Sequence, residues 1–217
     1  MRQRYSSLLE RARHGTVFEG FQYRLERVGI SLTPYYWVLE GAWDVVLPEL
    51  REDRASCWTG FFGAYEMKTL AGEGWNYSEM QLLSMLERGK KCFGAKIKGE
   101  VAASMWIDLQ EACCAWYRFP LNGDEAYLFD MYTIKSFRGK GMAPYVRYQC
   151  YKALREMGRN KFYSYSDAFN RPSLRFKKKL GAEFLQLGLY VKILDRFGYN
   201  WVIRRYRDCD LISRNMS

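Results

Sequence analysis

Hydrophobic and polar positions follow different patterns along the two halves of the chain. Residues 34–40 (PYYWVLE) are aromatic and β-branched, which predicts a strand. Residues 78–88 carry apolar side chains at helical spacing, and Gly89 follows as a stop signal. Between them, residues 42–74 are rich in aromatic side chains without a clear period, so no element is predicted there. A short basic helix is expected at residues 4–13.

The pattern changes at residue 91, where strand-like runs begin. Residues 91–97 and 100–109 flank Lys98-Gly99, a two-residue turn that favours a β-hairpin. A further strand is predicted over 112–119. The turn residues Leu-Asn-Gly-Asp at 121–124 then lead into an apolar strand at 125–134.

Helices and strands alternate after residue 135. A glycine-rich loop (KSFRGKG) precedes a helix with Pro144 in its first turn, where a missing N–H costs least. After a short strand at 161–166, Asn170 can cap a second helix, which Gly181 ends. A long hairpin follows, with strands at 184–194 and 199–206.

This order of elements predicts an α/β (α+β) fold with a mixed sheet. The chain has 217 residues, of which 48% are hydrophobic, so it can bury a sizeable core. No linker or repeat divides it, and we expect a single domain over 1–217. Its mean hydropathy is −0.38, and it contains no apolar run long enough to span a membrane. The N-terminus does not resemble a signal peptide, and we expect a cytoplasmic protein.

Charge and cysteine usage narrow the function further. The net charge of +10 favours anionic partners, but it does not choose among nucleic acid, lipid, an acidic carrier protein and a phosphorylated cofactor. Six cysteines without Cys-x-x-Cys spacing and a single histidine, His14, do not predict a metal site. We expect reduced thiols, with Cys113 and Cys114 buried in a strand.

The loop before the helix at Pro144 has the chemistry of a phosphate cradle. It consists of Arg138, Gly139, Lys140, Gly141, Met142 and Ala143. Small residues let the main chain approach a diphosphate, and N–H groups at a helix start favour an anion. The loop matches neither the Gly-x-Gly-x-x-Gly pattern nor a Walker loop, and a turn that binds nothing stays open as an alternative.

Two sequence blocks carry a resemblance to a known family. RGKGMA at 138–143 matches the Arg/Gln-x-x-Gly-x-Gly/Ala signature of the GNAT superfamily of acyl-CoA-dependent N-acyltransferases. NRPS at 170–173, continuing to KLGA at 179–182, resembles the second block of that family. The similarity covers residues 91–193. It implies an acyl-CoA-binding core at 91–206, with 1–75 as a divergent N-terminal part.

The resemblance implies a site as well as a fold. The central sheet would splay near Met131, Tyr132 and Thr133, with the pantetheine arm of acetyl-CoA or another acyl-CoA paired to the main chain of Met131 and Thr133. The pyrophosphate would lie on the amides of the 138–143 loop, and Asn170 and Ser173 would touch the cofactor arm. An amine would then attack the thioester carbonyl directly, without a metal.

The usual acid and base of the family are replaced in this sequence. Where many relatives carry a glutamate before an aspartate, this chain has Phe129 and Asp130. Asp130 is a candidate base if a bulge re-aims its side chain. Glu125 is a second candidate, although it lies about 13 Å further back along the strand. Lys177 stands at the place of the usual tyrosine acid, and a solvated lysine is expected there.

Several functions stay open at this point. The donor is acyl-CoA, most simply acetyl-CoA, or a longer acyl group on an acyl carrier protein. A CoA-binding protein without turnover and a nucleic-acid-binding module are the alternatives, although nucleic acid is not an expected partner. A solvated helix face is predicted for the basic run of Arg175, Lys177, Lys178 and Lys179. The acceptor amine is not determined and could belong to a polyamine, an amino sugar, an antibiotic, an amino acid or a protein N-terminus. A homodimer also stays open.

A group of aromatic side chains in the first third of the chain is expected to form core, with part of it lining an acceptor pocket. Its members are Phe18, Tyr35, Tyr36, Trp37, Trp43, Trp58, Phe61, Phe62 and Trp75.

Overall fold

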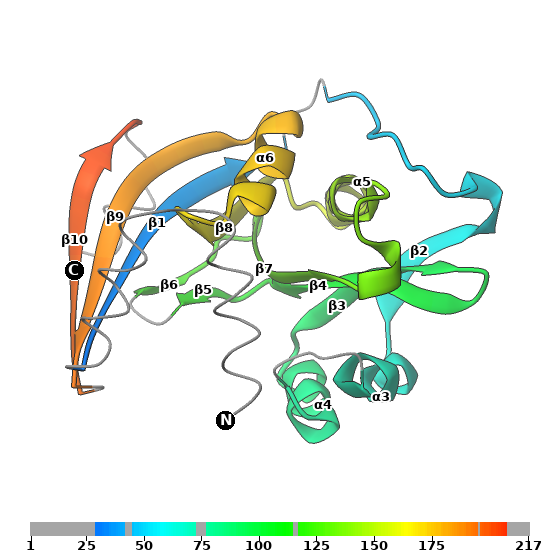
Figure 1. Ribbon diagram of the computed structural model, residues 1–217, viewed down its shortest axis with the longest axis horizontal. Coiled ribbons are helices and arrows are strands. Elements are labelled where there is room, and N and C mark those ends of the chain that lie inside the picture. The colour runs from blue at the N-terminus through cyan, green and yellow to red at the C-terminus, as the bar shows by residue number, and fades with distance from the viewer. Residues whose placement is uncertain (1–28, 42–44, 73–76, 115–116, 195, 208–217) are drawn as a thin grey trace.

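The computed structural model describes residues 29–41, 45–72, 77–114, 117–194 and 196–207 (Figure 1). The helix expected at 4–13 lies outside these residues. So do His14, Phe18, Trp43, Trp75 and Cys209.

An eight-stranded mixed sheet forms the centre of the molecule, in the order β10-β9-β1-β8-β7-β4-β3-β2. Its strands are β1 (Ile30–Glu40), β2 (Cys57–Phe62), β3 (Lys91–Ile97), β4 (Glu100–Asp108), β7 (Glu125–Thr133), β8 (Lys161–Asp167), β9 (Glu183–Ile193) and β10 (Phe197–Arg205). Neighbouring strands are antiparallel except for β7 and β8, which are parallel. The mixed α/β fold is therefore confirmed. The sequence did not indicate that β1 lies between β8 and β9.

Helices cover both faces of the sheet near β7 and β4. Helices α5 (Met142–Glu156) and α6 (Arg171–Lys179) lie on one face, and α3 (Ala64–Gly72) and α4 (Glu79–Glu87) lie on the other (Figure 1). The predicted Asn170 cap is present, and α4 has a cap that was not predicted, in which the Ser78 hydroxyl accepts from Gln81 N. The Asn170 side chain accepts from Ser173 N at the start of α6. We call these faces the α5/α6 face and the α3/α4 face.

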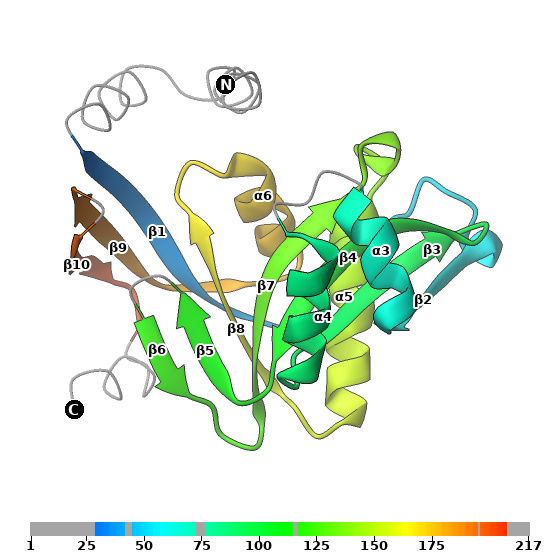
Figure 2. The same cartoon turned by 90° about the horizontal axis from the view of Figure 1, so that it is seen from below.

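Two parts of the sequence prediction need correction. Residues 112–119, expected to be one strand, belong to two short strands, β5 (Glu111–Cys114) and β6 (Tyr117–Pro120), that pair only with each other (Figure 2). Cys113 and Cys114 are half-buried rather than buried. Ala112 and Phe119 are the fully buried residues of this small sheet, and they pack against the large one. The unpredicted region 42–74 contains β2 and α3. Its Trp58 and Phe61 are exposed, whereas Phe62 is in the core.

The main core lies between the sheet and α5. The helical spacing of Met142, Val146, Cys150 and Leu154 places these fully buried side chains along one side of α5. They pack against β4, whose residues are almost all buried because both of its faces are covered. This packing fixes the start of α5 at the end of β7.

The sheet splays between its two parallel strands. β7 and β8 pair only from Glu125 to Tyr127, opposite Lys161 to Tyr163, and beyond Tyr127 they diverge. The splayed sheet that the family resemblance implied is present, and it opens along the half of β7 that ends at Thr133.

Candidate active site

The loop between β7 and α5 exposes a row of main-chain amides. Gly139 and Gly141 adopt positive φ values of 78° and 82°, which only glycine adopts readily. Within the described residues, no protein group accepts a hydrogen bond from the amides of Gly139, Lys140, Gly141, Met142 or Ala143. Because these amides surround the N-terminus of a 15-residue helix, the loop has the geometry of an anion site.

A segment just before β2 braces this loop from outside. Arg51 N donates to the Lys140 carbonyl at 3.0 Å, and the Lys140 ammonium lies 2.5 Å from Glu52 Oε1. A Cβ added at Gly141 would lie 2.3 Å from the Glu49 carbonyl oxygen. The positive charge of Lys140 is thus paired with Glu52. Sequence reasoning missed this segment because it has no periodic pattern.

A cavity of about 810 Å³ lies beside the loop. It is lined by the bracing segment, the end of β7, the loop and the outer side of α6, including Met131, Tyr132, Thr133, Arg138, Gly139, Gly141, Met142 and Ala143. Arg138 Nε donates to the Thr133 carbonyl at 3.0 Å, so its side chain lies back along the end of β7. The cavity brings most of the predicted donor-binding residues together.

A second cavity, of about 380 Å³, fills the splay itself. β7 and β8 form its walls, and α5 and α6 contribute Arg147, Asn170, Ser173, Phe176 and Lys177. The two cavities adjoin, because Met131, Thr133, Ala143, Pro172 and Phe176 line both. A continuous path therefore leads from the loop amides into the gap between the parallel strands.

Asp130 reaches this splay cavity through a bulge in β7. Between the pairs Trp106↔Phe129 and Ser104↔Tyr132 the register shifts, and Asp130 has a φ of 48°. The bulge turns Asp130 to the α3/α4 face, where its carboxylate accepts from the Tyr77 hydroxyl at 2.8 Å. The bulge in β7 that would re-aim Asp130 is therefore confirmed.

The surroundings of Asp130 make it a better base than an ordinary aspartate. Although the residue is exposed as a whole, its carboxylate lies against protein, and this burial raises its pKa. The hydrogen bond from Tyr77 and the charge of Lys90 act in the opposite direction. Tyr165 faces the same end of the cavity, and burial raises its pKa to about 12.

The structure does not bring Glu125 to either cavity. Glu125 is fully buried at the start of β7, where its carboxylate accepts from Asn122 N at 2.8 Å and from the Tyr163 hydroxyl. These contacts hold the turn before the strand. Glu125 is therefore a structural carboxylate. Asp130 is the acidic side chain of β7 that lines the splay cavity.

Comparison with known proteins agrees with this geometry. The model of the acetyltransferase (GNAT) family matches residues 47–182, more than half of the chain. The chain belongs to the GNAT acetyltransferase family. GNAT proteins transfer acyl groups from acyl-CoA. A search of curated proteins finds no match.

Solved GNAT structures share the fold of this protein. A GCN5-related N-acetyltransferase from Sphaerobacter thermophilus superposes with a TM-score of 0.56 at 14% identity, covering 83% of this chain and 58% of its own. A GNAT acetyltransferase from Colwellia psychrerythraea gives 0.53 at 15% identity, with coverages of 85% and 62%. One from Novosphingobium aromaticivorans gives 0.50 at 19% identity, with coverages of 76% and 66%. The chain thus spans about two thirds or less of the length of these structures.

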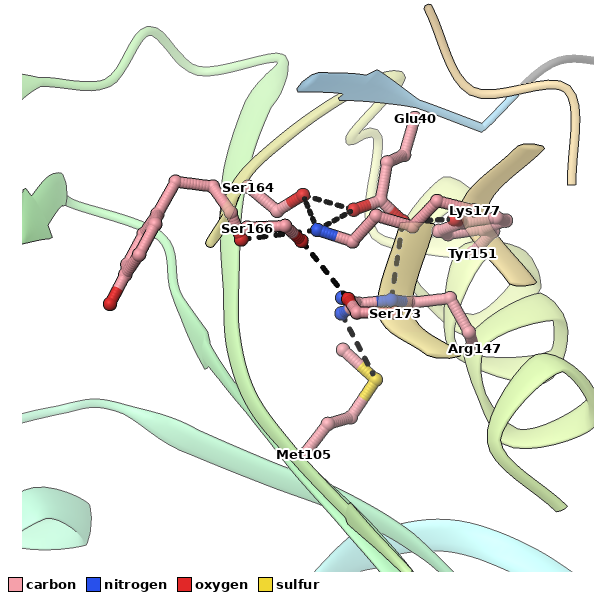
Figure 3. Close-up of polar contacts among 9 residues, drawn as sticks. Glu40, Met105, Arg147, Tyr151, Ser164, Ser166, Ser173 and Lys177 are labelled. Atoms are coloured by element: carbon pink, nitrogen blue, oxygen red, sulfur yellow. Dashed lines mark hydrogen bonds and ion pairs between the residues drawn. The ribbon is translucent and has the colours of Figure 1, made fainter. Parts of the chain in front are cut away.

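In this GNAT chain, the position expected to hold a solvated lysine is deeply buried. Lys177 is 2% exposed, and its ammonium donates to Ser164 Oγ at 2.7 Å and to the Tyr165 carbonyl at 3.1 Å (Figure 3). Its neighbours Arg175, Lys178 and Lys179 are exposed, as predicted. Lys177 differs because its place on α6 faces β8 and the splay.

Glu40, at the end of β1, is the carboxylate at the centre of this buried cluster. Lys177 Nζ lies 3.4 Å from Glu40 Oε1, and Arg147 Nε lies 3.2 Å from Oε2 (Figure 3). The hydroxyls of Ser164 and Tyr151 also donate to it. Burial acts to raise the pKa of Glu40, but the charges of Arg147 and Lys177 outweigh it and lower that pKa. For Lys177, burial lowers the pKa to about 8.

Two negative findings complete the description. Across the described ranges, no group of three or more His, Cys, Asp or Glu side chains could hold a metal ion. None of the helices that the structure describes is long and apolar enough to cross a membrane.

Proposed function

We propose that this protein transfers an acyl group from acyl-CoA to a primary amine by direct attack of the amine on the thioester. The observation that carries the proposal is the path from the unpaired loop amides, through the splay, to Asp130. When bound, acyl-CoA supplies a carbonyl activated by its thioester bond. The residues of the protein then have to bind the donor, receive a proton from the amine and stabilise the leaving thiolate.

Donor binding falls to main-chain groups. The amides from Gly139 to Ala143 would hold the pyrophosphate, and the end of β7 at Met131 and Thr133 would align the pantetheine arm in the splay. Asn170 and Ser173 line the splay cavity beside this path. The fit is supported by the positive φ values of the two glycines, which present successive amides without a side chain in the way.

Proton transfer falls to Asp130. Burial raises the pKa of Asp130, which makes its carboxylate a stronger base than that of an ordinary aspartate. Tyr77 orients the carboxylate. On the α5/α6 face, the ammonium of Lys177 lines the cavity and supplies positive charge for the thiolate that leaves.

The test is donor binding by two matched glycine variants. Gly141 and Gly158 both have positive φ, at 82° and 78°, but only at Gly141 would a Cβ meet protein. We expect Gly141→Ala to bind CoA at least about tenfold more weakly by calorimetry, and Gly158→Ala to bind it like the unaltered protein. Equal CoA affinity in the two variants would refute the loop assignment.

A second measurement tests turnover. Thiol release from acetyl-CoA and other acyl-CoA donors is followed with a panel of primary amines. We expect amine-dependent thiol release. CoA binding without thiol release from any donor would leave a CoA-binding protein and exclude the transferase.

A further inference from the structure

Arg147 is a buried cation whose terminal N–H groups have no oxygen acceptor among the described residues. It lies on α5, is 2% exposed and lines the splay cavity. Its Nε lies near Glu40, and its Nη1 lies 3.6 Å from the thioether of Met105 (Figure 3). Its guanidinium lies 5.8 Å from the Phe176 ring. Among the described residues, no oxygen accepts a hydrogen bond from either Nη atom, and a thioether is a weak acceptor. A guanidinium in such a place lacks a partner for its terminal N–H groups.

The charges around Arg147 do not balance. Glu40 is the carboxylate within ion-pair distance of both Arg147 and Lys177, so the cluster carries one excess positive charge when Lys177 is protonated. Lys177 already donates to Ser164 and to the Tyr165 carbonyl, whereas Arg147 keeps free donors. A buried uncompensated charge is costly, so an anion that enters the cavity is favoured.

The other acidic groups of the cavity are engaged elsewhere. Asp130 accepts from Tyr77 on the α3/α4 face, and Asp167 accepts from Phe169 N at 2.7 Å. Neither is within ion-pair distance of Arg147. The cavity is therefore polarised, with its carboxylate at Asp130 and its excess cation at Arg147.

Arg147 lies on the face from which the donor would enter. It comes from the helix that begins at the loop amides, and Ala143 and Phe176 line both its cavity and the loop cavity. Asp130 is turned to the α3/α4 face, where it accepts from Tyr77, so the proposed function places the amine on that side of the sheet. A group that reaches Arg147 therefore arrives as part of the donor.

We propose that Arg147 binds a carboxylate carried by the acyl group, so that the donor is the CoA thioester of a short dicarboxylic acid, such as malonyl-CoA or succinyl-CoA. This inference rests on the proposed function and replaces the acetyl group with a charged one. The amine nitrogen forms a bond to the thioester carbonyl carbon, and the C–S bond breaks. The electron pair leaves on the sulfur, Asp130 takes the amine proton, and the product amide keeps its free carboxylate.

The experiment compares two donors of equal chain length, succinyl-CoA and butyryl-CoA, with one amine that carries no carboxylate. Their binding is measured by calorimetry and their kcat/KM by thiol release. A charge-assisted pair with Arg147 predicts a preference for succinyl-CoA of about tenfold or more. Arg147→Gln should abolish this preference, and Arg147→Lys should retain part of it. The exposed Arg175→Gln is the matched control and should leave the preference unchanged.

The outcomes separate this inference from the proposed function. Equal use of the two donors, or an equal loss with both in a folded Arg147→Gln, would overturn the carboxylate site while the transferase stands. Thermal unfolding of each variant verifies that it is folded. If no donor releases thiol, the proposed function fails, and the calorimetric ratio still tests Arg147.

Discussion

The two faces of the sheet at the splay carry different kinds of chemical groups. On the α5/α6 face, the loop presents main-chain amides and α5 and α6 contribute two buried cations. On the α3/α4 face, Asp130, Tyr77 and Tyr165 present side chains with raised pKa values. The first face has the chemistry of anion binding and the second that of proton transfer.

The sequence encodes the two kinds of site in different ways. Main-chain amides need only a glycine-rich loop at a helix start, so a short continuous motif suffices to build them. The proposed acid–base groups come from β7, from β8 and from Tyr77, two residues before α4, and tertiary packing assembles them. The first arrangement tolerates much side-chain change, whereas the second depends on single residues.

The largest expected effect comes from removing the proposed base, Asp130, on the α3/α4 face. Asp130→Asn should lower kcat for thiol release about 100- to 10,000-fold, because a general base contributes rate enhancement of that order. CoA affinity, which belongs to the other face, should stay the same by calorimetry. Asp124→Asn, which loses a surface ion pair with Lys161, serves as control. If Asp130→Asn lowers CoA affinity as well as kcat, the assignment of donor binding and proton transfer to different faces is wrong.

A smaller effect is expected from the buried lysine on the α5/α6 face. The pKa of Lys177 is about 8 in the folded protein and 10.5 ordinarily, so the unfolded chain binds more protons between these pH values. The free energy of unfolding should therefore rise with pH across this window, by up to about 3 kcal/mol from this residue. Lys177→Met should lack that rise.

Denaturant unfolding at pH 8 and pH 10.5 measures this difference. The exposed neighbour Lys178→Met is the matched control and should keep the rise. If Lys177→Met and the unaltered protein show the same pH dependence, the ammonium is not buried as the structure has it.

The smallest effect concerns the orientation of the base. Tyr77→Phe removes the hydrogen bond that favours ionised Asp130, so the pKa of Asp130 should rise further. The acid limb of the kcat/KM profile for thiol release should move to higher pH by about one unit or less. Tyr199→Phe on the exposed edge strand β10 should leave it in place. A shift to lower pH would show that Tyr77 does not act on Asp130.

Much of the fold was predictable from local signals. Gly89, Gly158 and Gly181 end helices where the sequence indicated, and Lys98-Gly99 forms the expected hairpin turn. The loop from Arg138 to Ala143 was predictable because its conformation depends on its own glycines. Each of these features depends on residues that are close together in the sequence.

Other parts of the site were not predictable, because distant residues determine them. Residue type does not distinguish Lys177 from the exposed lysines beside it, and its burial depends on Glu40, which is 137 positions earlier in the sequence. The bracing segment around Arg51 has no regular pattern and becomes visible only through its contact with Lys140. A helical projection that places Lys177 on the inner side of α6 was the one signal available.

The position of β1 between β8 and β9 has a consequence for where this protein can be cut. The segment that matches the family model, 47–182, excludes both β1 and β9. A fragment with those limits would leave one edge of β8 open and both buried cations without their carboxylate. The segment matched by the family model is therefore not a complete structural unit, because β8 pairs with β1 and β1 pairs with β9.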